Sequence, residues 1–328
     1  MRDNLLRVLR LGAIIALGVA LLSCGKREGG GKEEGESEKG LVVGFSQVGA
    51  ESAWRTAETT SMQEEAAKRG IALKFSDAQG KQEKQIQALR AFIAQGVDAI
   101  ILAPVVETGW EPALKEAKAA SIPVVLVDRG IEVADESLYA TLIASDFILE
   151  GKMAAEWLAK KMNGTAGIVE LQGTPGAAPA IDRKAGFEQG IAQYPGMQII
   201  ASQSGDFRRS NGKEVMEAFL KIHGKKINAL YAHNDDMAIG AIQAIEEAGL
   251  KPGEDIIVVS VDAVKGAFEA MVAGKLNCTV ECNPLLGPLA FDAVEKILAG
   301  QTLPKRIVIE DRVFDQSAAK DVIGTRKY

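Results

Sequence analysis

The chain has 328 residues, of which 47% are hydrophobic and 25% are charged, a composition typical of a globular protein of one to three domains. Its formal net charge of −6 argues against a nucleic-acid-binding protein, because neutralising phosphates requires a basic surface. Aromatic residues make up only 5% of the chain, so a local concentration of them is informative.

The first 23 residues have the pattern of a secretory signal peptide. Three arginines fall within residues 1–10, and an uncharged apolar run covers residues 11–22. This run is too short to cross about 30 Å of hydrocarbon as a helix. The alternatives are a start-site error or a buried helix. The sequence "LLSC" resembles the lipobox of bacterial lipoproteins, which implies cleavage before Cys24 and attachment of lipid to that cysteine.

Residues 24–40 are predicted to form a flexible tether. From Gly25 to Gly40 the chain has no apolar side chain and mixes glycine with lysine and glutamate, so it cannot bury enough surface to offset the entropy of ordering. Lipid on Cys24 followed by a tether predicts an exported domain held at the cell envelope, in the periplasm or on the outer face of the cytoplasmic membrane.

From residue 41 onward, β-branched runs alternate with segments of helical spacing. The first series predicts strands at 41–47, 71–77, 97–105 and 122–128, and helices at 53–69, 81–95 and 107–120. The second predicts strands at 137–146, 166–173, 197–205, 227–235 and 255–262, and helices at 147–163, 178–193, 210–222 and 236–248. A helix at 284–299 and a strand at 305–310 follow. Such alternation predicts an α/β protein, with two units of parallel sheet covered by helices at roughly 41–145 and 146–282.

Polar and aromatic side chains follow nearly every predicted strand. In open parallel sheets, ligands bind beyond the carboxyl ends of the strands. The side chains at those ends are Glu51, Trp54, Arg55, Asp128, Arg129, Asp182, Arg183, Asp206, Phe207, Arg208, Asn234, Asp235, Asp236 and Asp262. Planar Asp, Asn and Arg groups bind neighbouring hydroxyls, and aromatic faces pack against C–H surfaces. The set favours a neutral sugar over a phosphate, because no glycine-rich phosphate loop follows these strands.

Each of these residues also has a purely structural interpretation. Asp128 and Arg129 could form a surface ion pair, Asn234 and Asp235 could cap a helix, and Trp54 could belong to the core. His233 with nearby aspartates could suggest a metal site, but successive side chains of a strand point to opposite faces, so His233, Asp235 and Asp236 cannot all face one ion. We therefore predict neither a metal nor a cofactor.

The sequence does not favour an enzyme. It lacks the G-x-S-x-G, H-E-x-x-H and kinase motifs, although a glycosidase using Glu51, Asp128 or Asp262 remains open. Cys278 and Cys282 lie four residues apart, about 13 Å in a strand, whereas a disulfide requires about 7 Å or less. We expect both cysteines to be buried fillers.

Long stretches of the chain resemble the type I periplasmic binding proteins of the ribose-binding group, which supply sugar ABC importers. The resemblance runs from about residue 41 to about residue 300 and is closest to members that bind galactofuranose. It is carried by "VGFSQVGAESAWRTAET", "KQIQALRAFIAQGVDAIILAPVVETGWEPALKEAK", "IPVVLVDR", "VELQGTPGAAPAIDRKAGF", "SQSGDFRRSNGKEVMEAF" and "YAHNDDMAIGAIQAIEEAGLKPG".

The resemblance implies two Rossmann-like lobes joined by a three-stranded hinge. The lobes would comprise 41–144 plus 283–312 and 145–282 plus 313–328, with hinge crossings near 144–146, 281–284 and 311–314. The implied sugar contacts are Glu51, Ser52, Trp54, Arg55, Asp128, Arg129, Arg183, Phe207, Asn234 and Asp262. Two departures from the family pattern are Ala53, where glycine is expected, and Cys282, where an amide is expected and for which Glu281 is a weak substitute.

The implied function is sugar delivery. A monomer would bind a monosaccharide between the lobes, close, and dock on the transmembrane subunits of an ABC permease. Galactofuranose is implied, although arabinose, ribose and galactopyranose would use the same residue types. The alternatives are a receptor for chemotaxis or a sensor kinase, and the effector domain of a repressor. A repressor would need a helix-turn-helix where this chain has a signal and a tether.

Overall fold

The computed structural model describes residues 40–328. The predicted signal peptide, the lipidation site Cys24 and the tether as far as residue 39 lie outside the described residues. Within residues 40–328, no helix is long and apolar enough to cross a membrane.

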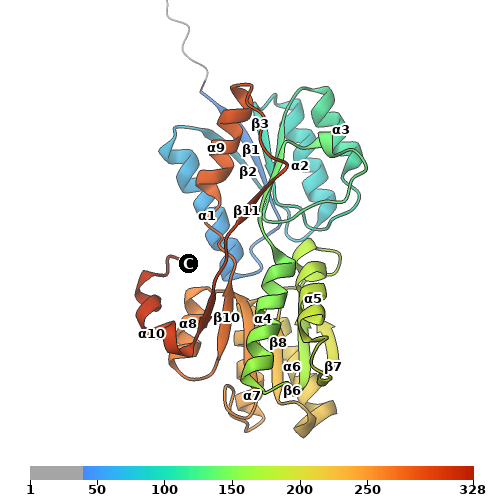
Figure 1. Ribbon diagram of the computed structural model, residues 1–328. Coiled ribbons are helices and arrows are strands. Elements are labelled where there is room, and N and C mark those ends of the chain that lie inside the picture. Colours follow the sequence, from blue (N-terminus) through green and yellow to red (C-terminus); the bar gives the residue numbers. More distant parts are fainter. Residues whose placement is uncertain (1–39) are drawn as a thin grey trace, which may run out of the picture. The chain divides into compact units, whose positions relative to one another are not determined.

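The first sheet has six parallel strands in the order β11-β5-β4-β3-β1-β2 (Figure 1). These strands are β1 (Val42–Gln47), β2 (Ala72–Asp77), β3 (Ala99–Leu102), β4 (Val124–Val127), β5 (Thr141–Ser145) and β11 (Arg306–Ile309). Its helices are α1 (Ala53–Lys68), α2 (Gln82–Ala94), α3 (Glu111–Ala119) and α9 (Gly287–Leu298).

Alternating side chains of this sheet fill two separate cores. In β3, Ile101 packs with residues of α1 and α9, whereas Ile100 and Leu102 pack with residues of α2 and α3. This period of two is the pattern of a strand buried on both faces, and it explains the continuous β-branched runs in the sequence.

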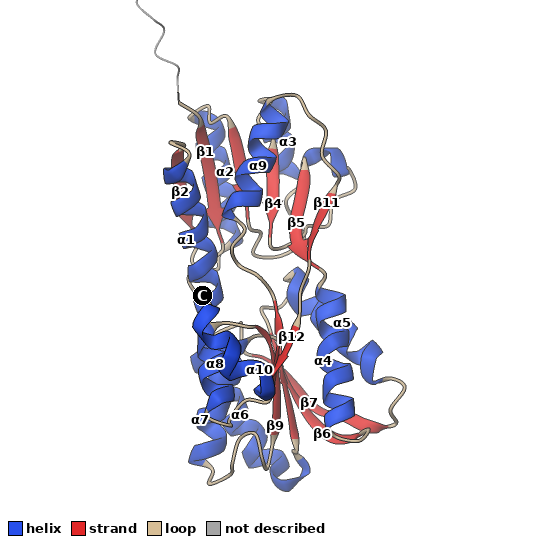
Figure 2. Cartoon of the chain, turned by 60° about the vertical axis from the view of Figure 1, so that its left-hand side comes forward, coloured by secondary structure: helices blue, strands red, loops and turns tan. Residues whose placement is uncertain are grey.

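The second sheet has the order β12-β10-β9-β8-β6-β7 and is parallel except for β12, which runs antiparallel to β10. Its strands are β6 (Thr165–Gln172), β7 (Gly196–Ser204), β8 (Ala229–Ala232), β9 (Ile257–Asp262), β10 (Cys278–Glu281) and β12 (Val313–Asp315). Helices α4 (Phe147–Lys161) and α5 (Ala178–Ile191) lie on one side of this sheet (Figure 2). Helices α6 (Arg209–His223), α7 (Asp235–Glu247) and α8 (Lys265–Val272) lie on the other. Helix α10 (Gln316–Val322) follows β12.

The chain passes between the two sheets three times. It leaves the first sheet after β5 to begin α4, returns after β10 to begin α9, and crosses again between β11 and β12 (Figures 1 and 2). Each lobe is therefore built from two separate stretches of sequence. The predicted α/β fold of two lobes with mostly parallel sheets is confirmed.

Several element boundaries differ from the prediction. The strand expected at 137–146 is shorter: a 3₁₀ helix, η1 (Glu136–Leu138), comes first, and β5 begins at Thr141. The helix expected at 107–120 begins only at Glu111, with Pro112 in its first turn, where the missing N–H is tolerated. Two short 3₁₀ helices, η2 (Gly224–Lys226) and η3 (Ile323–Thr325), were not predicted.

Close packing of α4 on α5 positions one of the candidate site residues. A Cβ at Gly186 would lie 2.1 Å from the carbonyl oxygen of Ile148, and one at Gly151 would lie 2.3 Å from that of Arg183. Only glycine permits this approach. As a result, Arg183 on α5 can reach Glu150 on α4.

Candidate functional site

All ten residues that the family resemblance implied as sugar contacts line one cavity between the two lobes. Two further residues, Pro179 and Cys282, complete its lining. The first lobe supplies the residues after β1 and β4, and the second lobe supplies the residues after β7, β8 and β9 and from α5. The cavity lies at the carboxyl ends of strands from both sheets, as expected for an open parallel sheet.

Three of the lining residues have left-handed backbone conformations. The φ angles are 60° for Asp128, 60° for Phe207 and 123° for Asp262, and none of these residues is glycine. Such conformations are costly for residues with side chains, and they cluster at functional sites because the surrounding structure fixes them. The strain supports a functional role for this cavity.

Arg55 organises the first-lobe side of the cavity. Its guanidinium donates to Asp128 (Nη2–Oδ2, 2.6 Å), Glu58 (Nη1–Oε2, 2.5 Å) and Glu51 (Nε–Oε1, 3.1 Å). Burial by itself would lower the pKa of Arg55, but attraction to Asp128, Glu58 and Glu51 raises it well above its usual value. Arg129 lies beside this group, with Nη2 3.5 Å from Glu51 Oε1. The first lobe therefore presents fixed charges of both signs.

Arg183 has the equivalent position in the second lobe. Its Nε donates to Glu150 Oε2 at 2.6 Å, its Nη1 donates to the carbonyl of His233 at 2.6 Å, and its Nη2 lies 3.6 Å from Asp262 Oδ1. Burial raises the pKa of Asp262 well above its usual value, and attraction to Arg183 offsets this only in part. A carboxyl group that holds its proton can donate as well as accept a hydrogen bond.

Asn234 combines the structural and the functional interpretations. Its Oδ1 accepts from the backbone N–H of Met237 at 3.0 Å and so caps α7, while its Nδ2 donates to the carbonyl of Phe207 at 3.1 Å. The capping role predicted as an alternative is therefore confirmed. The same amide lines the cavity.

Two aromatic rings line the cavity and make contacts across the lobes. The indole N–H of Trp54 donates to the carbonyl of Cys282 at 2.6 Å, which joins α1 to the segment leaving β10. The guanidinium of Arg129 lies 5.4 Å from the ring centre of Phe207 in the other lobe, within the range of a cation–π interaction. Trp54 is only 4% exposed, so it packs with the core of the second lobe while lining the cavity.

Some residues considered in the sequence lie elsewhere. His233 contacts Glu170 (3.1 Å) in the interior, and residues 40–328 contain no group of three side chains able to hold a metal. Glu281 pairs with Arg312 and Arg326 and does not line the cavity. It therefore does not replace the amide expected at position 282.

Cys282 and Pro179 line the cavity but were not predicted as site residues. Cys282 was noted only for its departure from the family pattern, and nothing in the sequence marked Pro179. Burial raises the pKa of the Cys282 thiol well above its usual value, so it stays neutral, and its Sγ lies 3.7 Å from Ser145 Oγ. Both cysteines in the described part of the chain are buried and free, as predicted.

The cavity is small, about 20 Å³, which is room for roughly one water molecule. Its lining side chains are nearly all buried. A ligand larger than water can therefore enter only when the two lobes separate.

Three relatives are similar over nearly the whole described chain. The galactofuranose-binding protein YtfQ of Escherichia coli (strain K12) is 55% identical over 88% of this chain and 92% of its own length. A component of the arabinose ABC transporter of Shewanella sp. ANA-3, solved with α- and β-L-arabinofuranose, is 57% identical, with a TM-score of 0.86 over 88% of this chain and 96% of that one. A Mycobacterium smegmatis protein solved with β-D-fucofuranose is 52% identical, with a TM-score of 0.86 over 88% and 95% of the two chains.

Residues 43–302 also match a protein family as a whole, the periplasmic binding protein domain. Together with the structural matches, this confirms the resemblance stated from the sequence and the type I fold. The chain belongs to the family of periplasmic binding protein domains.

Proposed function

We propose that this chain binds a monosaccharide in its furanose form between the two lobes and delivers it to the permease of an ABC importer. The observation that carries the proposal is the convergence of three arginines, five polar or acidic side chains and two aromatic rings on one cavity. Neutral sugars require this combination of hydroxyl-binding groups and C–H-packing faces.

The ligands of the relatives point to one class of sugar. D-Galactofuranose, D-fucofuranose and L-arabinofuranose have the same configuration at C2, C3 and C4 and differ only in the tail carried on C4. All three relatives are more than half identical to this chain. We therefore propose that the charged groups around Arg55 and Arg183 select the ring and that the tail is less strictly recognised.

Closure of the lobes is the proposed mechanism of capture. The cavity is nearly filled by its own side chains, so a sugar enters an open form and is then enclosed. Closing excludes water and strengthens the hydrogen bonds to the sugar. The sugar can favour the closed form only by binding it more tightly than the open one.

The proposed role is binding without catalysis. A glycosidase needs one carboxyl group that protonates the leaving oxygen. Although burial raises the pKa of Glu51, attraction to Arg55 and Arg129 outweighs it and lowers that pKa, which makes Glu51 a poor proton donor. Asp128 accepts a hydrogen bond from Arg55. Glu51 and Asp128 suit accepting hydrogen bonds from sugar hydroxyls, and the pKa of Asp262, which burial raises, suits donating one.

Calorimetric titration with L-arabinose, D-galactose and D-fucose tests the proposal, with D-glucose as the control sugar. We expect a dissociation constant near micromolar, about −8 kcal/mol, for at least one of the three. The NMR spectrum of ¹³C-labelled sugar, added in less than the protein's molar amount, should show the anomeric signal of the furanose. Absence of heat with all three sugars, or a bound pyranose, would contradict the proposal.

We further propose that the protein acts as a monomer anchored to the cell envelope by lipid on Cys24. The proposal rests on the lipobox-like sequence and the tether that follows it. Growth with labelled palmitate should label the wild type and leave Cys24→Ala unlabelled and released from the membrane fraction. An unlabelled wild-type protein would rule out the anchor without affecting sugar binding.

A further inference from the structure

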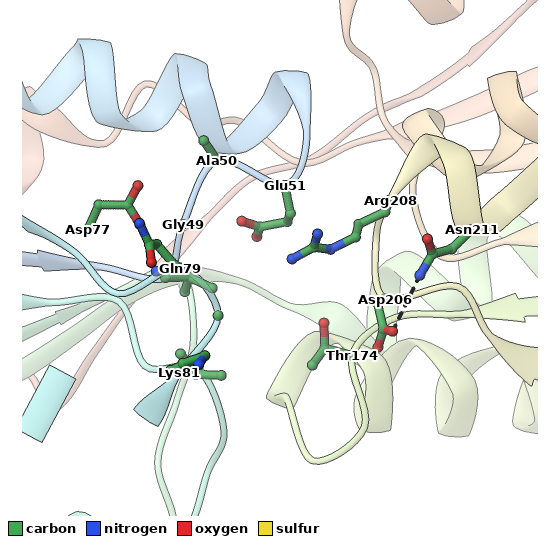
Figure 3. A pocket seen from close by; sticks show the side chains of 13 residues that line it. Gly49, Ala50, Glu51, Asp77, Gln79, Lys81, Thr174, Asp206, Arg208 and Asn211 are labelled. Atoms are coloured by element: carbon green, nitrogen blue, oxygen red, sulfur yellow. Dashed lines mark hydrogen bonds between the residues drawn. The ribbon is translucent and has the colours of Figure 1, made fainter. Parts of the chain in front are cut away.

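A second and larger cavity, which we call the outer cavity, measures about 790 Å³. It lies beside the cavity around Arg55 and Arg183, which we call the inner cavity. This volume is within the range of about 300–1,000 Å³ that is usual for ligand pockets. Both lobes line the outer cavity, and eight of its thirteen lining residues carry polar side chains (Figure 3). Its polar side chains are Glu51, Asp77, Gln79, Lys81, Thr174, Asp206, Arg208 and Asn211.

Glu51 connects the two cavities, because it lines both. Its side chain is only 8% exposed, and its Oε1 lies within 3.5 Å of both Arg55 and Arg129 in the inner cavity. No other residue among 40–328 donates a hydrogen bond to its second oxygen, Oε2. Figure 3 shows the carboxylate extending into the outer cavity. Glu51 therefore presents Oε1 to the inner cavity and Oε2 to the outer cavity.

Two cations line the outer cavity from opposite lobes. Lys81 directly precedes α2 in the first lobe, and Arg208 directly precedes α6 in the second. Arg208 reaches across the gap, since a Cβ at Gly80 would lie 3.9 Å from its Nη2. Within the described residues, neither cation has a carboxylate within 4 Å. Both therefore have donors available to a ligand.

Hydrogen-bond acceptors that line the outer cavity determine which class of ligand it can bind. Asp206 and Asn211 form a loose contact in the second lobe (Nδ2–Oδ2, 3.5 Å), and Asp77 lies opposite in the first. With Glu51, the carboxylates outnumber the two cations by three to two, so a strongly anionic group such as a phosphate would be repelled. A neutral group with many hydroxyls can use both the donors and the acceptors.

We propose that the outer cavity is a subsite for a second sugar ring, joined by a glycosidic bond to the ring in the inner cavity. The protein then binds furanose-containing disaccharides as well as free monosaccharides. This inference rests on the proposed function, because the inner ring must first occupy the cavity around Arg55 and Arg183. Glu51 would contact both rings.

Calorimetry with two disaccharides tests the subsite. In one, galactofuranose is linked through C1 to the second sugar; in the other, it is linked through an oxygen of its C4 tail. We expect at least one to bind with an affinity comparable to that of the monosaccharide. Arg208→Ala and Asn211→Ala should each weaken disaccharide binding by about three- to tenfold, the loss of one hydrogen bond, and leave monosaccharide binding unchanged.

The matched control is Lys225→Ala, which removes an exposed cation of the same lobe outside the outer cavity. It should change neither affinity. Binding of the monosaccharide with exclusion of both disaccharides would overturn the subsite and leave the proposed function intact. Equal losses for both ligands in Arg208→Ala and Asn211→Ala would also overturn it. Failure of the monosaccharide itself would refute the proposed function and the subsite with it.

Discussion

Arg55 shows how a single side chain sets the character of the site. It holds three carboxylates, Glu51, Glu58 and Asp128, at 2.5–3.1 Å, and the group is almost completely buried. Fixed charges cost little reorganisation when a ligand binds, because their orientation is already set. Hydroxyl groups of a sugar can therefore bind to this cluster without rearranging it.

Replacing Asp128 by asparagine should weaken sugar binding by about 1–3 kcal/mol, because a charge-assisted hydrogen bond is lost. Asparagine keeps the shape of the side chain and tolerates the φ of 60°. Calorimetry measures the affinity, and a thermal melt checks that the fold is retained. The control is Asp321→Asn, at an exposed position. Unchanged affinity would show that Asp128 does not contact the ligand.

The carboxyl ends of parallel strands converge, and this placed most of the cavity residues near one edge of a predicted sheet. The family resemblance was needed to select the ten, because Asp206 and Arg208 also follow a strand and do not line this cavity. The sequence could not show that Glu281 turns toward Arg312 and Arg326. The direction of the Glu281 side chain at the end of β10 depends on Arg312 in the third hinge segment and on Arg326 after η3, which lie 31 and 45 positions later in the chain. For the same reason, the sequence did not identify Cys282 as a lining residue.

At the scale of elements, the first turns of α1 and α7 contact each other across the lobes. The backbone N–H of Ala53 donates to Asp236 Oδ2 at 2.8 Å, and Asp236 Oδ1 accepts from Arg209 Nε and Nη2 at 3.0 and 2.7 Å. Asp236 does not line the inner cavity. The Ala53–Asp236 bond exists only while the lobes are together, so it favours the closed form.

Asp236→Ala should therefore weaken sugar binding by about 1 kcal/mol through faster release, although no group in the cavity changes. Stopped-flow tryptophan fluorescence measures the release rate. Arg209→Ala is the matched variant, since it removes the intralobe partner of Asp236 and retains the bond to Ala53. Equal effects of the two variants would exclude a specific role for the contact between the lobes.

Elements with their own periodic signal were predicted well, and those that depend on distant partners were missed. The alternation of buried strands and helices in the sequence predicted most of the helices from α1 to α7. Strand β12 has three residues and exists through its antiparallel pairing with β10, about 35 residues away. Helices α8 and α10 have eight and seven residues, too few for a clear helical period.

The hinge that joins the two lobes contains a largely buried carboxyl group, that of Asp311. Asp311 lies between β11 and β12, and its Oδ1 is buried without a hydrogen-bond partner among the described residues. Burial, with repulsion from Glu150, raises the pKa of Asp311 from 3.8 to about 8. The folded protein therefore binds this proton more tightly than the unfolded chain does.

Ionisation of Asp311 should make the protein less stable in alkaline solution. The contribution of its neutral form is fully present below the unfolded pKa of 3.8 and is lost as pH rises through about 8. Asp311→Asn cannot ionise, so its melting temperature should fall less than that of the wild type between pH 6 and pH 9. An equal fall in melting temperature for the two proteins between pH 6 and pH 9 would show that Asp311 is not protonated in the folded protein.

The three crossings between the lobes also constrain how the protein can be made. The first sheet gains its sixth strand only when residues 306–309 pair with β5, more than 160 positions earlier in the chain. The second sheet is likewise complete only when residues 313–315 pair with β10. Neither half can reach its final form during synthesis until nearly the entire polypeptide has left the ribosome, so the nascent chain stays incompletely folded while it is handed to the secretion machinery.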